Sequence, residues 1–279
     1  MSNDEILQKM HKLHLVLADE VKRICEKHNI EYFLLAGTFL GAIRHKGFIP
    51  WDDDMDFGMT RNNFEKFLAV ADNELDEKKF YLQTDRKEKY YAYNFAKLRL
   101  VGTRVIEGFS SDVNANQGIY IDIFPMDVVS DSKIKSFFQY KSFYIYRNLL
   151  WVKCGYGTAE RKKTLSYKLA RIVAVPFTIE HLKKRKMDVM AKFHDEDAEC
   201  VVASDGAWGL KKETLQYKWL KSLKNYPFED KEYPGFEDYD GYLTYMYNDY
   251  MQLPPEEKRN HHARLDVDFG KYGIEMVDK

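Results

Sequence analysis

The chain has 279 residues, 45% of them hydrophobic, which is enough to bury a substantial core and excludes an intrinsically disordered chain. Its formal net charge of −1 excludes a global field that would recruit nucleic acid. The three cysteines have no metal-type or redox-type spacing, the N-terminus lacks the apolar segment of a signal peptide, and no apolar run approaches the roughly 18 residues of a membrane span, so we expect a cytoplasmic protein.

The start of the chain predicts helices that alternate with buried strands. Apolar residues recur at three- and four-residue steps through residues 4–28, as in an amphipathic helix. Residues 31–36 change period and predict a short strand. One or two helical turns capped by Thr38 are expected over 39–45, and a loop then leads to a second strand over 54–59.

Further elements complete a sheet domain. Thr60 is expected to cap a helix that runs to about Leu75. Strand patterns follow over residues 80–84, 91–100, 104–108 and 119–124. This order predicts an α/β or α+β fold, with a catalytic core over residues 1–131.

The remainder, residues 132–279, differs in charge and pattern. Residues 133–194 contain 15 Lys and Arg against three acids, a net charge of +12. They predict helices broken at Pro176, and either a solvated helical pair or a surface for an anionic membrane leaflet fits this composition. Residues 226–255 predict an irregular wrap with one helical piece at 242–251.

An acidic strand is the most informative feature. Successive side chains of a strand point to opposite faces, so Asp54 and Asp56 are expected on one face about 6.5 to 7 Å apart, with Met55 and Phe57 entering the core. Such a pair suits Mg²⁺ or Mn²⁺ bound together with substrate phosphates, rather than Zn²⁺. Asp122, a lone acid in an apolar strand, is the candidate third carboxylate.

A Gly-Thr pair before a short helix predicts a phosphate contact. Gly37 lets the backbone approach an anion, and the N–H groups that follow favour negative charge. Basic residues near the acids and on a neighbouring strand are candidates for binding a diphosphate. Each feature alone also has a structural interpretation: Gly-Thr is a common turn and cap, and an acidic run is commonly a solvated loop. The alternation of the acids with Met55 and Phe57 favours a sheet.

These residues resemble a known family. The stretch from Ala36-Gly37-Thr38 to Asp56 is similar to the signature of the LicD family, the phosphocholine transferases of bacterial surface polysaccharides, related to fukutin and fukutin-related protein. The segments 118–127 and 253–262 resemble further family blocks, so the likeness spans nearly the whole chain. One departure is Tyr247-Asn248-Asp249, where much of the family has Tyr-Gly-Asp, which puts the local turn in doubt.

The resemblance implies an α+β fold with a nucleotidyltransferase (DNA polymerase β-like) core, a mixed sheet, and helical and irregular C-terminal additions that complete the active site. It implies that Asp54 and Asp56 hold Mg²⁺ or Mn²⁺, with Asp122 as third carboxylate and Asp52 as an additional ligand. It also implies transfer of phosphocholine, or another phospho-alcohol, from a CDP-alcohol such as CDP-choline to a hydroxyl of a surface glycan, a teichoic-acid or a lipopolysaccharide precursor.

A choline donor would require a site for a quaternary ammonium group, which aromatic faces provide. Trp51, beside the acids, is the first candidate, although aromatic residues more commonly belong to the core. A C-terminal histidine such as His262 would serve as a base or phosphate contact, or would be structural. The predicted substrate contacts are Gly37, Thr38, Gly41, Arg44, Lys46, Trp51, Lys97, Arg99 and His262.

Two other functions fit the sequence. The same fold could transfer a nucleoside monophosphate to a small-molecule hydroxyl, or the chain could be a non-catalytic glycan-assembly protein. For the transferase, the acceptor would be a glycan carried on a lipid, and the basic segment would place a cytoplasmic enzyme peripherally at the inner face of the cell membrane.

Overall fold

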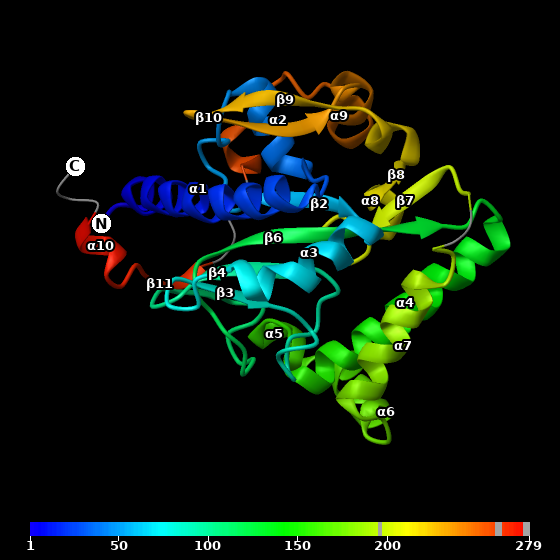
Figure 1. Ribbon diagram of the computed structural model, residues 1–279. Coiled ribbons are helices and arrows are strands. Elements are labelled where there is room, and N and C mark those ends of the chain that lie inside the picture. The colour runs from blue at the N-terminus through cyan, green and yellow to red at the C-terminus, as the bar shows by residue number, and fades with distance from the viewer. Residues whose placement is uncertain (195–196, 260–263, 276–279) are drawn as a thin grey trace.

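The computed structural model describes residues 1–194, 197–259 and 264–275, and its centre is a mixed β-sheet (Figure 1). The elements of the first half are α1 (Asn3–His28), β1 (Phe33–Leu34), α2 (Ala36–Arg44), β2 (Asp56–Thr60), α3 (Arg61–Glu74), β3 (Phe80–Gln83), β4 (Ala96–Leu100), β5 (Arg104–Glu107) and β6 (Tyr120–Val129). Those of the second half are α4 (Lys133–Cys154), α5 (Ala159–Lys163), α6 (Leu165–Ala174), α7 (Ile179–Ala191), β7 (Cys200–Ala203), α8 (Leu210–Glu213), β8 (Thr214–Gln216), η1 (Tyr217–Lys221), β9 (Leu223–Phe228), β10 (Lys231–Phe236), α9 (Tyr239–Tyr247), η2 (Glu256–Lys258), β11 (Arg264–Asp268) and α10 (Tyr272–Glu275). The predicted α+β class is confirmed.

The sheet has the strand order β1-β2-β6-β4-β3, and β6 is its organising strand. The first half of β6 runs parallel to β2 and antiparallel to β4. Its second half pairs antiparallel with β7, which in turn pairs with β8. The chain therefore returns after the α4–α7 helices to extend the sheet that the first half began.

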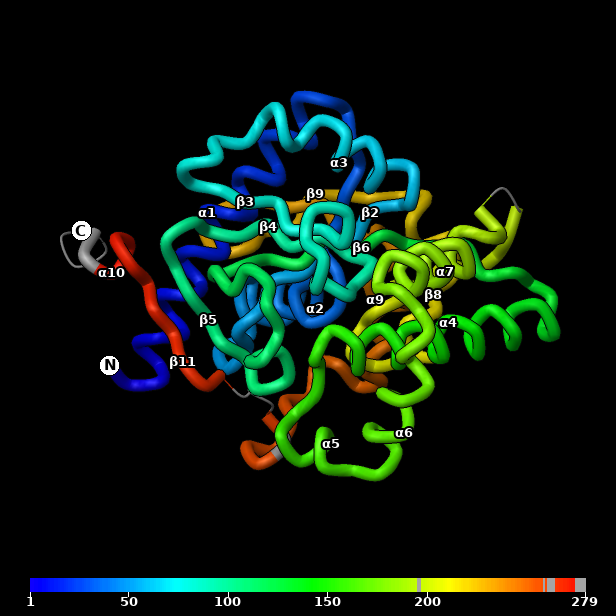
Figure 2. Tube along the Cα trace, turned by 90° about the horizontal axis from the view of Figure 1, so that it is seen from below, coloured from blue at the N-terminus to red at the C-terminus, as the bar shows by residue number. Residues whose placement is uncertain are grey.

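Residue alternation gives the sheet one apolar and one polar face. On β6, Ile121 and Ile123 are fully buried, and α1 and α3 pack over this apolar side. Asp127 points the same way and forms a buried ion pair with Arg61 of α3, with N–O distances of 2.8 Å. In Figure 2, α3 lies on the opposite side of the sheet from β5 and α5. The polar face is thus available for chemistry.

Helix α1 confirms the predicted amphipathic helix, and both its ends are capped. Ser2 and Glu5 form a reciprocal capping box at the start, which satisfies N–H groups that the helix itself leaves without partners. Asn29 ends the helix in the left-handed region that Asn tolerates better than most residues. Thr60 caps α3 as predicted, accepting a hydrogen bond from the backbone N–H of Asn63.

Three predicted boundaries near the acids were wrong. Helix α2 begins at Ala36, so Thr38 lies inside it and is not its cap; Leu35 takes that position in an extended conformation. Strand β2 begins at Asp56, so Asp54 and Met55 precede the strand, although the Asp122 N–H still donates to the Met55 carbonyl at 2.9 Å. The strand predicted over 91–100 is β4 alone, because the residues before it are held as a loop: Lys186 of α7 donates to the Ala92 carbonyl and the Asn94 N–H donates to Asp205.

The C-terminal wrap was predicted as irregular over 226–255, but it contains the antiparallel hairpin β9–β10. Each strand carries a proline, which argues against a central strand but is tolerated in a two-stranded ribbon. Helix α9 confirms the predicted helical piece, shifted by a few residues. Strand β11 pairs with β5, so the far C-terminal part also contacts the core.

The basic segment is helical, as predicted. Its helix α6 ends at Ala174, just before Pro176. Helices α4, α6 and α7 pack on one another around a small apolar cluster of their own that includes Leu150, Leu182 and Ala174. In Figure 1 these helices form an arm that extends from one end of the sheet. No helix in the described ranges is both long and apolar enough to span a bilayer.

Candidate active site

A transverse row of polar side chains crosses the polar face of the sheet. Asp56 of β2 is in register with Asp122 of β6, Asp122 with Lys97 of β4, and Lys97 with Gln83 of β3. Residues in register on neighbouring strands point to the same face with their Cβ atoms about 5 Å apart. The two acids that the sequence separates by more than sixty positions are therefore neighbours.

The acids form a crowded group in which Asp122 is buried and Asp52, Asp54 and Asp56 are half-buried. Burial, then the charges of Asp54, Asp122 and Asp52, raise the pKa of Asp56 well above its ordinary value. The pKa of Asp122 is raised to about 6 by burial, although Lys97 opposes the shift. Lys97 donates to both carboxylate oxygens of Asp122 at 2.7 and 3.0 Å. The lysine thus compensates one carboxylate and leaves like-charge repulsion on the others.

This donor set fits a hard divalent cation. Carboxylate oxygens are the ligands that Mg²⁺ and Mn²⁺ prefer, and a cation would relieve the repulsion that raises the pKa of Asp56. Among the residues that the structure describes, no three Asp, Glu, His or Cys side chains form a closed metal cluster. Mg²⁺ commonly uses one or two carboxylates together with substrate phosphates, so an open pair of acids is sufficient.

Helix α2 supports the acids from behind. The hydroxyl of Thr38 accepts a hydrogen bond of 2.8 Å from the backbone N–H of Asp56, which fixes the start of β2. At Gly37 an added Cβ would lie 2.9 Å from a carboxylate oxygen of Asp52, and at Gly41 it would lie 2.5 Å from the carbonyl oxygen of Gly47. Both glycines therefore allow the acidic loop to approach the helix closely.

The other predicted contacts of this loop face the C-terminal wrap. Arg44 donates to the carbonyl of Tyr250 at 2.7 Å. Lys46 has an exposed side chain, and its backbone carbonyl accepts a hydrogen bond of 2.7 Å from the N–H of Glu229. The face of Trp51 already carries the guanidinium of Arg259, 4.4 Å from the ring centroid. That contact occupies the aromatic face on which a quaternary ammonium was predicted to bind.

The acidic loop is clamped by residues that the sequence did not single out. His11 of α1 contacts the carbonyl oxygen of Asp52 through Nε2 at 2.7 Å and stacks on Phe48 with ring centroids 4.0 Å apart. Arg264 of β11 forms an ion pair of 3.1 Å with the buried Asp53. These two partners lie at opposite ends of the chain, so their contacts with the acidic loop could not be predicted from local sequence. The one available signal was His11 itself, a histidine among the apolar residues of α1. His262 lies outside the described residues.

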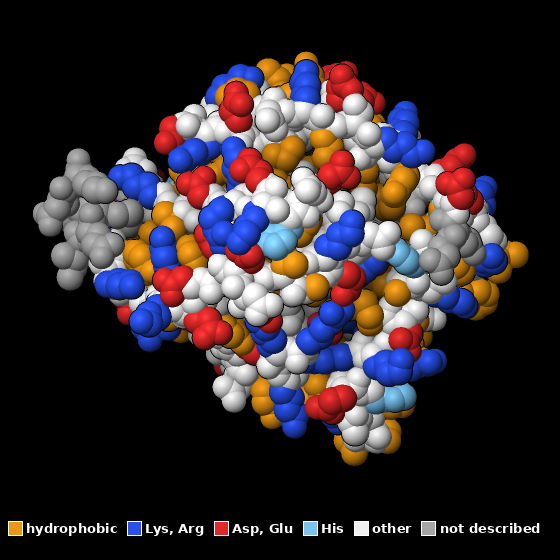
Figure 3. Space-filling model, in the orientation of Figure 1, with side chains coloured by type: hydrophobic (Ala, Val, Ile, Leu, Met, Phe, Trp, Pro, Cys, Tyr) orange, Lys and Arg blue, Asp and Glu red, His pale blue; other side chains and the backbone are white. Residues whose placement is uncertain are grey.

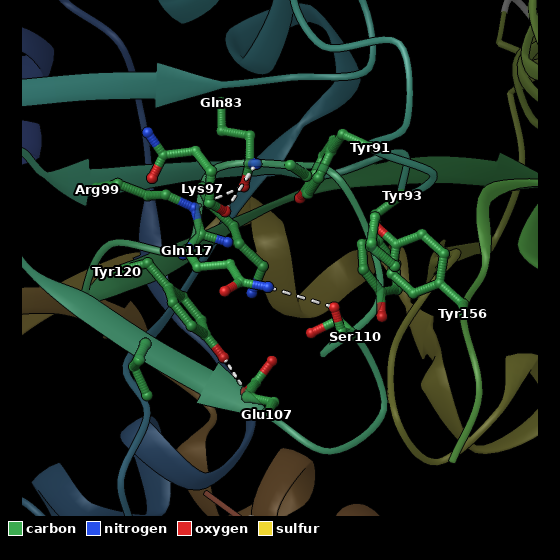
Figure 4. A pocket seen from close by; sticks show the side chains of 14 residues that line it. Gln83, Tyr91, Tyr93, Lys97, Arg99, Glu107, Ser110, Gln117, Tyr120 and Tyr156 are labelled. Atoms are coloured by element: carbon green, nitrogen blue, oxygen red, sulfur yellow. Dashed lines mark hydrogen bonds between the residues drawn. The ribbon is translucent and has the colours of Figure 1, made fainter. Parts of the chain in front are cut away.

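Lys97 and Arg99 continue the polar face into a small cavity, shown in Figure 4. Lys97 lies 3.3 Å from the ring centroid of Tyr120, and Arg99 donates to Gln83 Oε1 at 2.6 Å. The Tyr120 hydroxyl donates to Glu107 at 2.5 Å. The cavity volume is about 20 Å³, room for about one water molecule, so in this conformation it does not accommodate a trimethylammonium group.

A family model matches the part of the chain that contains these residues. Residues 29–153 match the family model described as "LicD/FKTN/FKRP, nucleotidyltransferase domain". This range contains α2, the acidic loop, β2, β4 and β6, and therefore all four acids and Lys97.

The chain is similar along most of its length to a protein of Haemophilus influenzae named lipopolysaccharide cholinephosphotransferase LicD. The two are 28% identical over 265 residues, which cover 92% of this chain and 95% of the relative. Shorter similarities exist to uncharacterized proteins of Rickettsia typhi, 39% identical over 19% of this chain and 18% of the relative, and Rickettsia prowazekii, 46% identical over 15% and 16%. Residues 29–153 are therefore similar to the LicD/FKTN/FKRP domain, and the chain as a whole is similar to a LicD protein.

Proposed function

We propose that this protein transfers phosphocholine, or another phospho-alcohol, from a CDP-alcohol donor to a hydroxyl group of a surface glycan, with Mg²⁺ or Mn²⁺ bound at its acids. The observation that carries the proposal is the alignment of Asp56 with Asp122 on the polar face, crowded by Asp54 and Asp52. The name of the Haemophilus influenzae relative supports choline phosphate as the transferred group and lipopolysaccharide as the type of acceptor.

Within this proposal the acids have distinct roles. Asp54 and Asp56 would hold the metal, with Asp52 and Asp122 beside them. When bound, the metal would neutralise charge on the donor's phosphates as the P–O bond breaks. Asp122 would accept the proton of the attacking hydroxyl, since a carboxylate with a pKa raised to about 6 is a better base near neutral pH than an ordinary one.

Lys97 holds that base in position. Its two hydrogen bonds to Asp122 fix the carboxylate plane, and the surrounding sheet buries both groups. Burial lowers the pKa of Lys97, while the charge of Asp122 opposes the change. Once Asp122 accepts a proton, Lys97 loses its counter-ion and is then suited to compensate the charge that develops on the donor's phosphates.

A donor panel tests the proposal. The full chain would be incubated with Mg²⁺ or Mn²⁺ and with CDP-choline, CDP-ethanolamine, CDP-ribitol or CDP-glycerol, together with a glycan acceptor, and CMP release would be measured. We expect release with at least one donor, loss on chelation, and a decrease of about 100-fold or more for Asp56→Asn and Asp122→Asn.

Asp230→Asn is the matched control, because Asp230 is an exposed acid on the β9–β10 turn and should leave the rate unchanged. The mass of the product identifies the transferred group. An acceptor that gains a nucleotide, consumption of ATP or UTP instead of every CDP-alcohol, or full activity of Asp56→Asn would each overturn the proposal.

A further inference from the structure

Helix α6 exposes an apolar stripe to solvent. Leu165, Leu169, Ile172 and Val173 recur at helical spacing and are 71%, 52%, 66% and 56% exposed. A surface helix normally points such a stripe at the core. In α6 only Tyr167 and Ala174 are buried, so the larger apolar side of this helix has no partner within the described chain.

Other parts of the arm also carry exposed apolar side chains. Val175, directly after α6, is 73% exposed, and α4 adds further large exposed side chains at Ile134, Phe137, Phe138 and Ile145. Figure 3 shows hydrophobic side chains at the outer edges of the arm, with Lys and Arg beside them. Large exposed apolar side chains that gather on one part of a protein mark an interaction surface.

The charges around the stripe identify its partner. Lys168 and Arg171 lie within α6, and exposed Arg161 and Lys163 precede it. Residues 133–179 contain a single acid, Glu160. A second copy of this chain is disfavoured, because a two-fold interface would place the same basic patch against itself. An anionic surface that also accepts apolar side chains satisfies both features, and a bilayer with anionic headgroups has this chemistry.

We propose that α6 lies in the interface of an anionic lipid bilayer, with its apolar stripe inserted among the acyl chains and its basic residues at the headgroups. The stripe from Leu165 to Val173 is about 12 Å long, and an interfacial helix inserts to a depth of about 5–10 Å. The arm connects directly to β6 and β7, so membrane contact would bring the sheet close to acceptors carried on lipid.

Co-sedimentation with vesicles tests this binding without donor or acceptor, so its outcome does not depend on the proposed transferase activity. The vesicles would contain phosphatidylcholine alone or with about 30% phosphatidylglycerol. We expect the wild-type chain to bind only the anionic vesicles, and more weakly at about 0.5 M salt. The double variant Leu169→Glu/Ile172→Glu should lower the partition coefficient about tenfold or more.

A matched control is Leu265→Glu/Val101→Glu, which adds the same charge at two exposed apolar residues outside the arm and should bind within about twofold of the wild type. Circular dichroism would verify that every variant is folded. No binding to anionic vesicles, or equal binding by the α6 variant, would overturn the proposal, as would an equal loss in the control. Dimerisation of the lipid-free chain that the α6 variant abolishes would instead assign the stripe to a second copy.

Discussion

At the scale of single residues, Thr38 shows how a side chain can have a different role from the one that its local sequence indicates. Gly-Thr before a helix indicates a cap, but the Thr38 hydroxyl is directed at β2 and accepts the Asp56 N–H at 2.8 Å. The signal for this role is not local, because it depends on β2 lying beside α2. Thr38 is therefore a positioning residue for Asp56.

Replacing Thr38 by Val keeps the side-chain shape and removes the acceptor. The Asp56 N–H would lose its partner in a buried environment, so we expect the free energy of unfolding to fall by about 1–3 kcal/mol. Urea denaturation measures this change. Thr38→Ser retains the hydroxyl and should recover most of the stability; equal losses in both variants would show that the methyl group, and not the hydrogen bond, is what matters.

Glu213 gives a pH-dependent prediction at the same scale. Glu213 is buried, and its carboxylate accepts a hydrogen bond of 3.0 Å from the backbone N–H of Trp208. Burial raises its pKa from 4.5 to about 7. Below pH 4.5 the group is protonated in both the folded and the unfolded states. As pH rises from about 4.5 to 7, the unfolded chain loses this proton first, so stability falls across that window, by roughly 2–3 kcal/mol.

Glu213→Gln removes the titration and keeps an oxygen that accepts the Trp208 N–H. Its stability relative to the wild type should therefore increase from pH 5 to pH 8 by roughly 2–3 kcal/mol, measured by urea denaturation at both values. Glu232→Gln, at an exposed glutamate of β10, is the control and should show no such trend. A constant difference at the two pH values would contradict the prediction.

At the scale of elements, the end of α9 has a strained backbone where this sequence departs from the resemblance to the LicD family. Asn248 follows the helix with φ 58° and ψ −114°, a conformation that suits glycine and strains other residues by about 1–3 kcal/mol. The Tyr-Gly-Asp pattern expected from the resemblance has glycine at this position. Asn248 is exposed, so this strain is not offset by burial of its side chain.

Asn248→Gly should relieve this strain. Glycine loses more chain entropy on folding, so the net gain should be about 1 kcal/mol, or an increase of about 2–4 °C in Tm by differential scanning calorimetry. Asn29→Gly is the comparison, because Asn29 has φ 52° and ψ 51°, a left-handed conformation that Asn tolerates. A larger gain at Asn29 than at Asn248 would contradict the assignment of strain.

The elements that sequence reasoning predicted well have strong local signals. Helices α1 and α3 combine a regular apolar stripe with a capping residue, and the first half of β6, before Pro125, combines an apolar run with a lone acid. Strands β7, β9 and β10 lacked such signals, because β7 is only four residues long and the other two contain proline. Their formation depends on partners far away in the chain, which no local pattern reveals.

At the scale of the whole molecule, the site depends on contacts between the two ends of the chain. Asp56 and Asp122 could be proposed as partners from their residue types, but their register could not. The same holds for the clamp on the acidic loop, which joins His11 near the N-terminus to Arg264 near the C-terminus. The C-terminal part of the chain therefore holds the acidic loop in place, through the ion pair of Arg264 as well as through packing.

The ion pair between Asp53 and Arg264 provides the test of this coupling. Both side chains are largely buried, at 3% and 11% exposure, so removing one partner leaves a poorly solvated charge. We expect Arg264→Gln to destabilise the fold by roughly 3 kcal/mol, and a double-mutant cycle with Asp53→Asn to give a coupling energy above about 1 kcal/mol in urea denaturation. The pair Arg104–Asp266 also involves β11, which it joins to β5, but it is about half exposed, with side-chain exposures of 52% and 45%. Its coupling should be below about 1 kcal/mol. Equal coupling in the two cycles would show that burial does not set the strength of this ion pair.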